Sequence, residues 1–251
     1  MERYQVILGY DGTAFGGMQR QDNARTIQGE FEAALRTIGW DGQSVLAAGR
    51  TDAGVHANGQ VVVFDLDWRH STQDLCNALN ANLPAEIGVQ QVFQIKPDFH
   101  PRFDAISRLY RYQILCRPNR DPLRERYAWR VWPEPDLDLL HKSAELLVGE
   151  HDFSAFGTPP QEGGTTIRRV FRAGWSRRGD ELTFEVEANA YLYHMVRRMV
   201  HLQVEVGLGK KLLDDLRYYL SGQADELIQG LAPACGLILQ QVTYPETPSY
   251  P

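Results

Sequence analysis

The segment GRTDAGVHA at residues 49–57 brings together three side chains that can do chemistry, Arg50, Asp52 and His56, between flanking glycines. Glycine lets the backbone turn tightly and approach a ligand closely. A carboxylate such as Asp52 can act as a nucleophile, and an arginine two residues away can hold it ionised. The same residues are typical of a simple turn in which Asp52 bonds to the backbone. Taken alone, they favour the turn over the nucleophile.

Two further segments contain candidate residues. In RLYRYQI at 108–114, a strand would point Arg108, Tyr110 and Tyr112 to one face. That face is either a solvated sheet surface or a basic and aromatic RNA-binding surface, and the residues alone do not distinguish these two interpretations. In HMVRRMV at 194–200, apolar neighbours predict burial of Arg197. A buried arginine needs a carboxylate partner, for which Asp52 is one candidate.

Arginine is unevenly distributed in this chain, which has a net charge of −6. There are 22 arginines and four lysines; residues 99–130 contain eight arginines against three acids, and residues 165–178 contain five arginines and no acid. Guanidinium groups match phosphate geometry and stack on bases. The distribution indicates two Arg-rich strands that face RNA, with the acids on the opposite side. Two solvated strand faces are the alternative.

Other site classes have little support. The three cysteines form no CxxC pair and no HExxH motif is present, so we expect no metal. The Asp65-x-Asp67 pair is expected on a solvent face. His201 is expected either to form a surface pair with Glu205 or to be partly buried with its hydrogen bonds satisfied. No apolar run approaches the roughly 18 residues of a membrane span, and the N-terminus does not resemble a signal peptide. We therefore expect a cytoplasmic protein.

Hydrophobic periodicity predicts the elements that position these residues. The first half is expected to contain strands at 4–8, 45–48, 61–66 and 88–95, with helices that begin at Thr26 and near Ser71. The second half repeats the order, with a strand at 106–115, helices at 137–148, 191–207 and 212–220, a hairpin that turns at Gly179, and a final strand GLILQQVTY. Each half is thus β-α-β-β-α-β, the ferredoxin-like or RRM-like order.

We predict an α+β fold in which the two halves form a continuous antiparallel sheet, with helices on one face and a cleft on the other. A proline-containing linker at 97–105 divides the chain. Residues 1–100 would form the half with the Asp52 loop. Residues 101–251 would form the half with the Arg-rich strands and the HMVRR helix.

The segment GRTDAGVHA closely resembles the catalytic motif of the tRNA pseudouridine synthases that modify uridines 38 to 40 of the anticodon stem-loop. Further segments occur in that family's order and approximate spacing: YDGTAFGGMQRQ, NANLP, FHPRFDA, RLYRYQI, GEHDFSAFG and NAYLYHMVRRMV. The resemblance implies an isomerase that converts uridine to pseudouridine at tRNA positions 38, 39 and 40. It also implies a homodimer that needs neither a metal nor an organic cofactor.

The resemblance assigns roles to individual residues. Asp52 would be the nucleophile, Arg50 its ion-pair partner, and Arg197 a second arginine near it. Tyr110 would stack on the target uracil. We assign His100 and Arg102 to RNA contact, with His56 and Arg108 as further substrate-binding candidates. Pro101 departs from the family pattern, which has a small residue there, so we expect a stiffer loop.

Three other functions compete with the synthase. A non-catalytic RNA-binding module would share the fold and the arginines but would not need Asp52. A glycosidase-like enzyme would need a second carboxylate across the sugar, and none of the segments that match the family offers one. A metal hydrolase would lose its activity when a chelator removes its metal.

Overall fold

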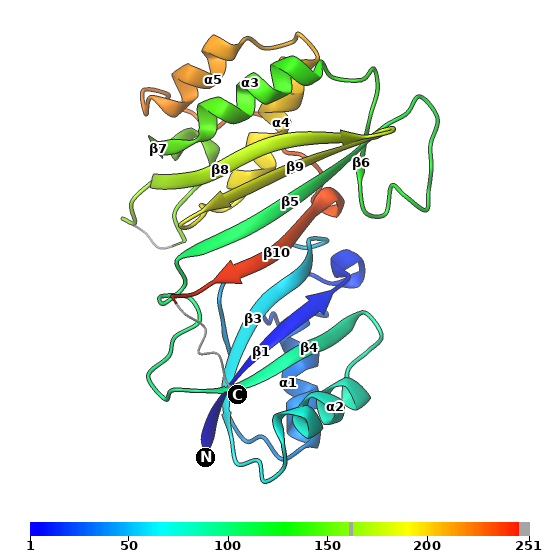
Figure 1. Cartoon of the computed structure of the whole chain (residues 1–251), viewed down its shortest axis with the longest axis vertical. Helices are drawn as coiled ribbons and strands as arrows, with labels where there is room; N and C mark the ends of the chain where they lie inside the picture. Colours follow the sequence, from blue (N-terminus) through cyan, green and yellow to red (C-terminus); the bar gives the residue numbers. More distant parts are fainter. Residues whose placement is uncertain (161–162, 246–251) are drawn as a thin grey trace. The chain divides into compact units, whose positions relative to one another are not determined.

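The computed structural model describes residues 1–160 and 163–245, and its contacts divide the chain into two compact units (Figure 1). Unit 1 contains Met1–Ile106 and the described residues from Ile238 onwards, and unit 2 contains Ser107–Leu237. Residues 238–245 therefore belong to the same unit as the beginning of the chain. The division into residues 1–100 and 101–251 stays a prediction.

Unit 1 is a sheet with two helices. Strands β4, β1 and β3 pair in that order, all antiparallel, and the short β2 adds to β3 in the antiparallel sense. The last strand, β10, also pairs with β3 but runs parallel to it. The elements are β1 (Glu2–Tyr10), α1 (Ile27–Thr37), β2 (Leu46–Ala47), β3 (His56–Leu66), α2 (Thr72–Asn82), β4 (Ile87–Ile95) and β10 (Leu237–Thr243).

Local signals account for both helices of unit 1. The Thr26 hydroxyl accepts a hydrogen bond from the Gly29 amide (3.2 Å), and Ser71 caps α2 through the Asp74 amide (3.1 Å). Helix α2 packs against β4 and α1, so both helices cover one face of the sheet (Figure 1). Phe31 of α1 meets Phe64 of β3 there at 5.8 Å, and both rings are buried.

The described part of unit 2 contains five strands and three α-helices. Strands β5, β9, β8 and β7 pair in that order, all antiparallel, and β6 adds to β5 in parallel. The elements are β5 (Ser107–Cys116), β6 (Trp129–Val131), α3 (Leu137–Leu147), β7 (Gly149–Asp152), β8 (Ile167–Arg178), β9 (Glu181–Ala188), α4 (Met195–Gly207) and α5 (Leu213–Leu220). Short 3-10 helices occur at Gly12–Ala14, Ser154–Phe156 and Ala234–Gly236.

The prediction of an antiparallel sheet was wrong in one respect, because each unit contains a parallel pair. Strands β6 and β7 were also missed, since three or four residues are too few to show an alternating pattern. The helices pack as expected of amphipathic elements. The indole of Trp175 on β8 donates a buried hydrogen bond to the Gln203 side chain of α4 (2.8 Å).

Helix α4 begins later than its sequence predicted. It starts at Met195 rather than at 191, because His194 has a φ of 66° in the left-handed region. Such a conformation costs a non-glycine residue about 1–2 kcal/mol. The ring of His194 stacks on that of Tyr193 with centroids 3.7 Å apart. None of the described helices is both long and apolar enough to span a bilayer.

Candidate active site

Asp52 lies in a turn on the connection from β2 to β3. The Asp52 carbonyl accepts a hydrogen bond from the Val55 amide (3.1 Å), and Gly54 supplies the positive φ of 77° that the turn requires. The side chain of Asp52 is half-buried, whereas Arg50 is exposed. A turn is thus present at Asp52, as Thr-Asp-Ala-Gly predicts, and the hydrogen bond that closes it uses the main-chain carbonyl of Asp52. The chemical role of the carboxylate stays a prediction.

Residues distant in sequence hold this turn in place. The Thr51 carbonyl accepts from the Met18 amide (3.0 Å), and the Thr51 hydroxyl shares a buried hydrogen bond with the Tyr10 phenol (2.7 Å). The Gln60 amide group donates to the Gly49 carbonyl (3.1 Å). Burial raises the pKa of Tyr10 to about 12, so the phenol stays neutral at physiological pH and keeps its hydrogen bond. The backbone immediately before Asp52 is therefore held by residues of β1, β3 and the loop after β1.

Gly17 approaches the turn closely. Its φ is 106°, and a Cβ placed on it would lie 2.8 Å from the Thr51 carbonyl oxygen and 3.3 Å from the carbonyl carbon of Asp52. Only glycine accepts both this conformation and this separation. The sequence segment AFGG contains Gly17, but no local pattern shows which backbone it touches.

His56 is the first residue of β3 and is buried. Its Nδ1 accepts from the Gly12 amide (3.0 Å) and lies 3.2 Å from a carboxylate oxygen of Asp11. To accept the hydrogen bond from Gly12, Nδ1 must carry no hydrogen, whereas an ion pair with Asp11 requires a protonated Nδ1. The hydrogen bond that the Gly12 amide donates corresponds to the neutral ring. His56 thereby ties β3 to the loop after β1, and its contact with substrate stays a prediction.

His100 and Arg102 lie in one turn of unit 1. Nδ1 of His100 accepts from the amides of Arg102 (3.1 Å) and Phe103 (3.4 Å), and Asp104 accepts from the His100 amide (2.8 Å). His100 therefore acts as the cap of this turn. Pro101 is buried, and its carbonyl accepts from the phenol of Tyr244 (2.8 Å).

The two tyrosines of β5 in unit 2 differ in burial. Tyr112 is fully buried, donates to the Pro233 carbonyl (2.7 Å), and has a pKa raised well above 10 by that burial. It is a core residue, so neither alternative proposed for this strand face describes it. Tyr110 is half-buried and meets the ring of Tyr191 edge-on at 5.1 Å.

Sequence reasoning missed Tyr191, although it lies in the NAYLYHMVRRMV segment. Its phenol donates to the carbonyls of Arg108 (3.1 Å) and Val186 (3.0 Å), and burial raises its pKa well above 10. Tyr191 thus fixes β5 and β9 next to Tyr110. The guanidinium of Arg108 donates to the Asn189 carbonyl (2.7 Å).

Arg197 lies in the first turn of α4 and is half-buried. Its Nε donates to the Ala232 carbonyl (2.8 Å), which ties the helix to the segment before β10. The neighbouring Arg198 donates to the carbonyls of Phe156 (3.1 Å) and Ile228 (3.3 Å), and burial lowers its pKa. The predicted pairing of Arg197 with Asp52 stays a prediction.

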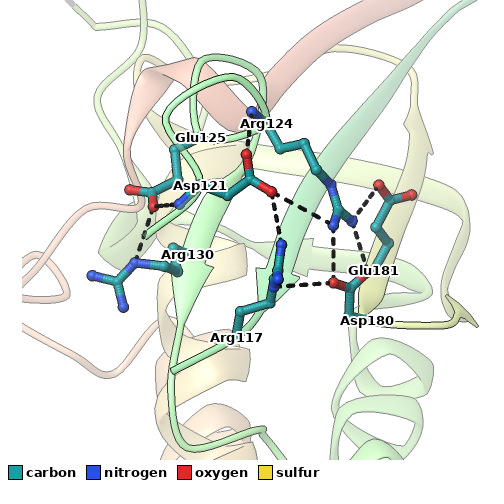
Figure 2. A network of polar contacts seen from close by, with 7 residues as sticks. All are labelled: Arg117, Asp121, Arg124, Glu125, Arg130, Asp180 and Glu181. Atoms are coloured by element: carbon teal, nitrogen blue, oxygen red, sulfur yellow. Dashed lines mark hydrogen bonds and ion pairs between the residues drawn. The ribbon is translucent and has the colours of Figure 1, made fainter. Parts of the chain in front are cut away.

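Acids lie among the arginines of unit 2 (Figure 2). Arg124 forms two hydrogen bonds with Asp180 (2.9 and 2.7 Å) and one with Glu181 (2.8 Å), while Arg117 pairs with Asp121 (2.7 Å). Across the sheet, strand β9 supplies partners for two more arginines, in the pairs Arg111–Glu185 and Arg172–Glu187. The expectation that the acids lie on the opposite side was wrong. Acids that are remote in sequence become neighbours across the sheet.

Asp65 and His201 have structural partners. Asp65 forms two hydrogen bonds with Arg3 (2.8 and 2.9 Å), which lower its pKa. His201 stacks near Trp129 (6.3 Å), and burial lowers its pKa. Among the described residues, no three His, Cys, Asp or Glu side chains are grouped so that they could hold a metal ion.

Comparisons with known proteins match most of the chain. The family model described as tRNA pseudouridine synthase matches residues 7–104 and 143–245, which include Asp52 and Arg197 but not Tyr110. Among solved structures, a chain of a Cbf5-Nop10-Gar1 complex aligns with a TM-score of 0.36 and 10% identity, over 80% of this chain and 45% of that one. That likeness is too weak to assign the fold.

Three relatives that match along nearly their whole length are named tRNA pseudouridine synthase A. The protein of Geobacter sp. (strain M21) is 38% identical over 98% of this chain and 100% of its own. That of Thermotoga sp. (strain RQ2) is 39% identical over 97% and 100%, and that of Limosilactobacillus fermentum is 36% identical over 97% and 96%. The chain therefore belongs to the tRNA pseudouridine synthase family, and it is an isomerase that modifies RNA.

Proposed function

We propose that this enzyme converts uridine to pseudouridine at positions 38, 39 and 40 in the anticodon stem-loop of tRNAs, with Asp52 as the nucleophile and no cofactor. The observation that supports it most is the bracing of the Asp52 turn by Tyr10, Met18 and Gln60. A nucleophile must be held in a defined geometry, and buried hydrogen bonds to its neighbours achieve this. The braced loop also lies in the segment that the family model matches.

The proposed reaction rearranges one nucleotide without adding or losing atoms. The bond between C1′ and N1 breaks, the freed uracil turns, and C5 bonds to C1′. The hydrogen on C5 leaves as a proton, and N1 gains one. The carboxylate of Asp52 promotes the first step by attack on the sugar or the ring, or by stabilisation of charge on the sugar. No electron transfer is needed, so the reaction requires no redox cofactor.

The target uridine must leave its stack before the bond can break. Tyr110 is the proposed replacement stacking partner, supported by its half-buried position and by Tyr191, which holds the strand beneath it. Arg50 and Arg197 are proposed to act on the carboxylate of Asp52. The proposed RNA-contacting side chains are His56, His100, Arg102 and Arg108.

Finer features of the fold and assembly belong to the same proposal. We propose that both halves of the chain are ferredoxin-like, which the strand order β4-β1-β3-β2 of unit 1 supports. The remaining elements of the proposal are a homodimer, a cytoplasmic location and activity without a metal.

Release of tritium from tRNA that contains 5-tritiated uridine tests the proposal, because only replacement of the C5 hydrogen produces it. We expect release by the wild type and none by Asp52→Asn, which keeps the shape of the side chain and removes its charge. Asp65→Asn is the matched control, because Asp65 is another half-buried carboxylate of unit 1 that pairs with Arg3. Release by Asp52→Asn at the wild-type rate would exclude Asp52 as the nucleophile. Absence of release by the wild type, with tRNA bound, would favour a non-catalytic RNA-binding protein.

A further inference from the structure

Phe103 presents a large aromatic ring to solvent. It is 72% exposed, and the His100 ring lies against it with centroids 4.3 Å apart at an angle of 36°. The guanidinium carbon of Arg102 lies 5.9 Å from the centre of the Phe103 ring. Single exposed apolar residues are common on protein surfaces. Here, however, a second ring and a cation adjoin the exposed one.

The turn that presents Phe103 is held rigidly. His100 caps it through two amides, and Asp104 accepts from the His100 amide. From outside the turn, Tyr244 donates to the Pro101 carbonyl, while Arg3 donates to the Phe99 carbonyl (3.2 Å). A backbone that is already held in place loses little conformational entropy on binding, which is typical of a binding surface.

The charges next to the ring indicate which part of an RNA it would contact. Residues 98–104 contain two carboxylates, Asp98 and Asp104, against one arginine. This local excess of negative charge repels phosphate, whereas an uncharged aromatic face suits a base. Exposed aromatic rings that adjoin arginine stack on unpaired bases in single-stranded nucleic-acid binding.

We propose that Phe103, extended by His100 and adjoined by Arg102, is a stacking platform for one unpaired base of the substrate RNA. This inference rests on the proposed function for the identity of the RNA. The platform is a binding surface and takes no part in bond making. Its base is distinct from the uridine that is isomerised, for which Tyr110 is the proposed stacking partner.

Affinity for an unmodified tRNA transcript tests the platform. Phe103→Leu keeps an apolar side chain but removes the ring, and stacking on one ring changes affinity by roughly 5- to 100-fold. We expect a loss in that range for Phe103→Leu and near wild-type affinity for Phe103→Tyr. The slope of log affinity against log salt should stay unchanged, because no charge is removed. Leu123→Ala is the control, since Leu123 is 85% exposed, apolar and not aromatic.

Fluorescence separates stacking from a merely structural role. With 2-aminopurine at each unpaired position of the anticodon loop in turn, stacking on Phe103 should quench one position when wild type or Phe103→Tyr binds. Phe103→Leu should lose that quenching while its melting temperature stays unchanged. Equal affinity and quenching for wild type and Phe103→Leu would overturn the platform. So would a change in oligomeric state with RNA affinity intact, which would assign Phe103 to contact with a second copy.

The same samples distinguish this inference from the proposed function. Tritium release by the wild type, together with RNA binding that Phe103→Leu does not change, would refute the stacking platform and leave the proposed reaction supported. RNA binding that depends on Phe103, without tritium release by the wild type, would support the stacking platform and refute the proposed reaction. A wild type that binds no RNA would overturn both.

Discussion

Replacement of Gly17 by alanine tests whether the loop after β1 positions Asp52. The new Cβ would lie 2.8 Å from the Thr51 carbonyl oxygen, whereas ordinary contacts begin near 3.4 Å. The neighbours on the approach side are backbone atoms of residues 51–53, which cannot rotate away. The turn that contains Asp52 must therefore move by about 0.6 Å, or Gly17 must move by the same amount.

The size of the effect follows from that displacement. A misplacement of about 1 Å costs a catalytic group about 100-fold in rate, so a displacement of about half that predicts a fall in kcat of about tenfold. KM for tRNA should change little, because the RNA-contact side chains do not move. The left-handed φ adds a stability cost of about 1–2 kcal/mol.

Gly39 offers a matched control for the backbone conformation. Its φ is 95°, close to the 106° of Gly17, but a Cβ placed on it would meet no atom within 4 Å. Gly39→Ala should therefore lose similar stability and keep the wild-type kcat. Single-turnover tritium release measures the rate, and denaturant unfolding measures the stability of each variant.

Equal kcat for Gly17→Ala and Gly39→Ala would refute the reasoning, because it would show that the rate is insensitive to the position of this turn. A fall in activity that matches the unfolded fraction of Gly17→Ala would refute it as well. In that case the loss would reflect stability alone.

Tyr10→Phe should destabilise the fold by about 1–3 kcal/mol, because the buried Thr51 hydroxyl loses its partner, as denaturant unfolding would show. The pKa of Tyr10 is raised to about 12, so its contribution to stability is complete below pH 10 and is lost as the pH rises towards 12. Tyr10→Phe should remove this part of the alkaline destabilisation, and an unchanged pH profile would contradict the assignment. Arg124→Ala should speed amide hydrogen exchange in residues 121–127, because the Arg124 guanidinium holds this segment to Asp180. Exchange in unit 1 should not change. Dialysis against a chelator should leave tritium release unchanged, and restoration of a lost rate by a divalent cation would show that a metal takes part.

The features that sequence predicts well depend on neighbours within a few residues. The cap at Thr26, the capping box at Ser71 and the turn at Asp52 all use side chains and amides within three positions. The order of the main helices and strands follows from periodicity over similar distances. The assignment of Asp52 as the nucleophile came from resemblance, since the residues alone favoured a plain turn.

The contacts that position the candidate site join residues that sequence cannot pair. Tyr10 and Thr51 are 41 residues apart, and Tyr112 and Pro233 are 121 residues apart, so no local pattern relates them. The same limit hid the acids of β9 that pair with arginines of β5 and β8.

The sequence by itself therefore determined the family, most of the elements and the chemistry-bearing loop, because motifs and periodicity are local. Only the tertiary structure decided which backbone braces Asp52, that Tyr112 is core, and that β10 runs parallel to β3. These outcomes depend on burial and on hydrogen bonds between distant strands. Such interactions form only when the chain is packed.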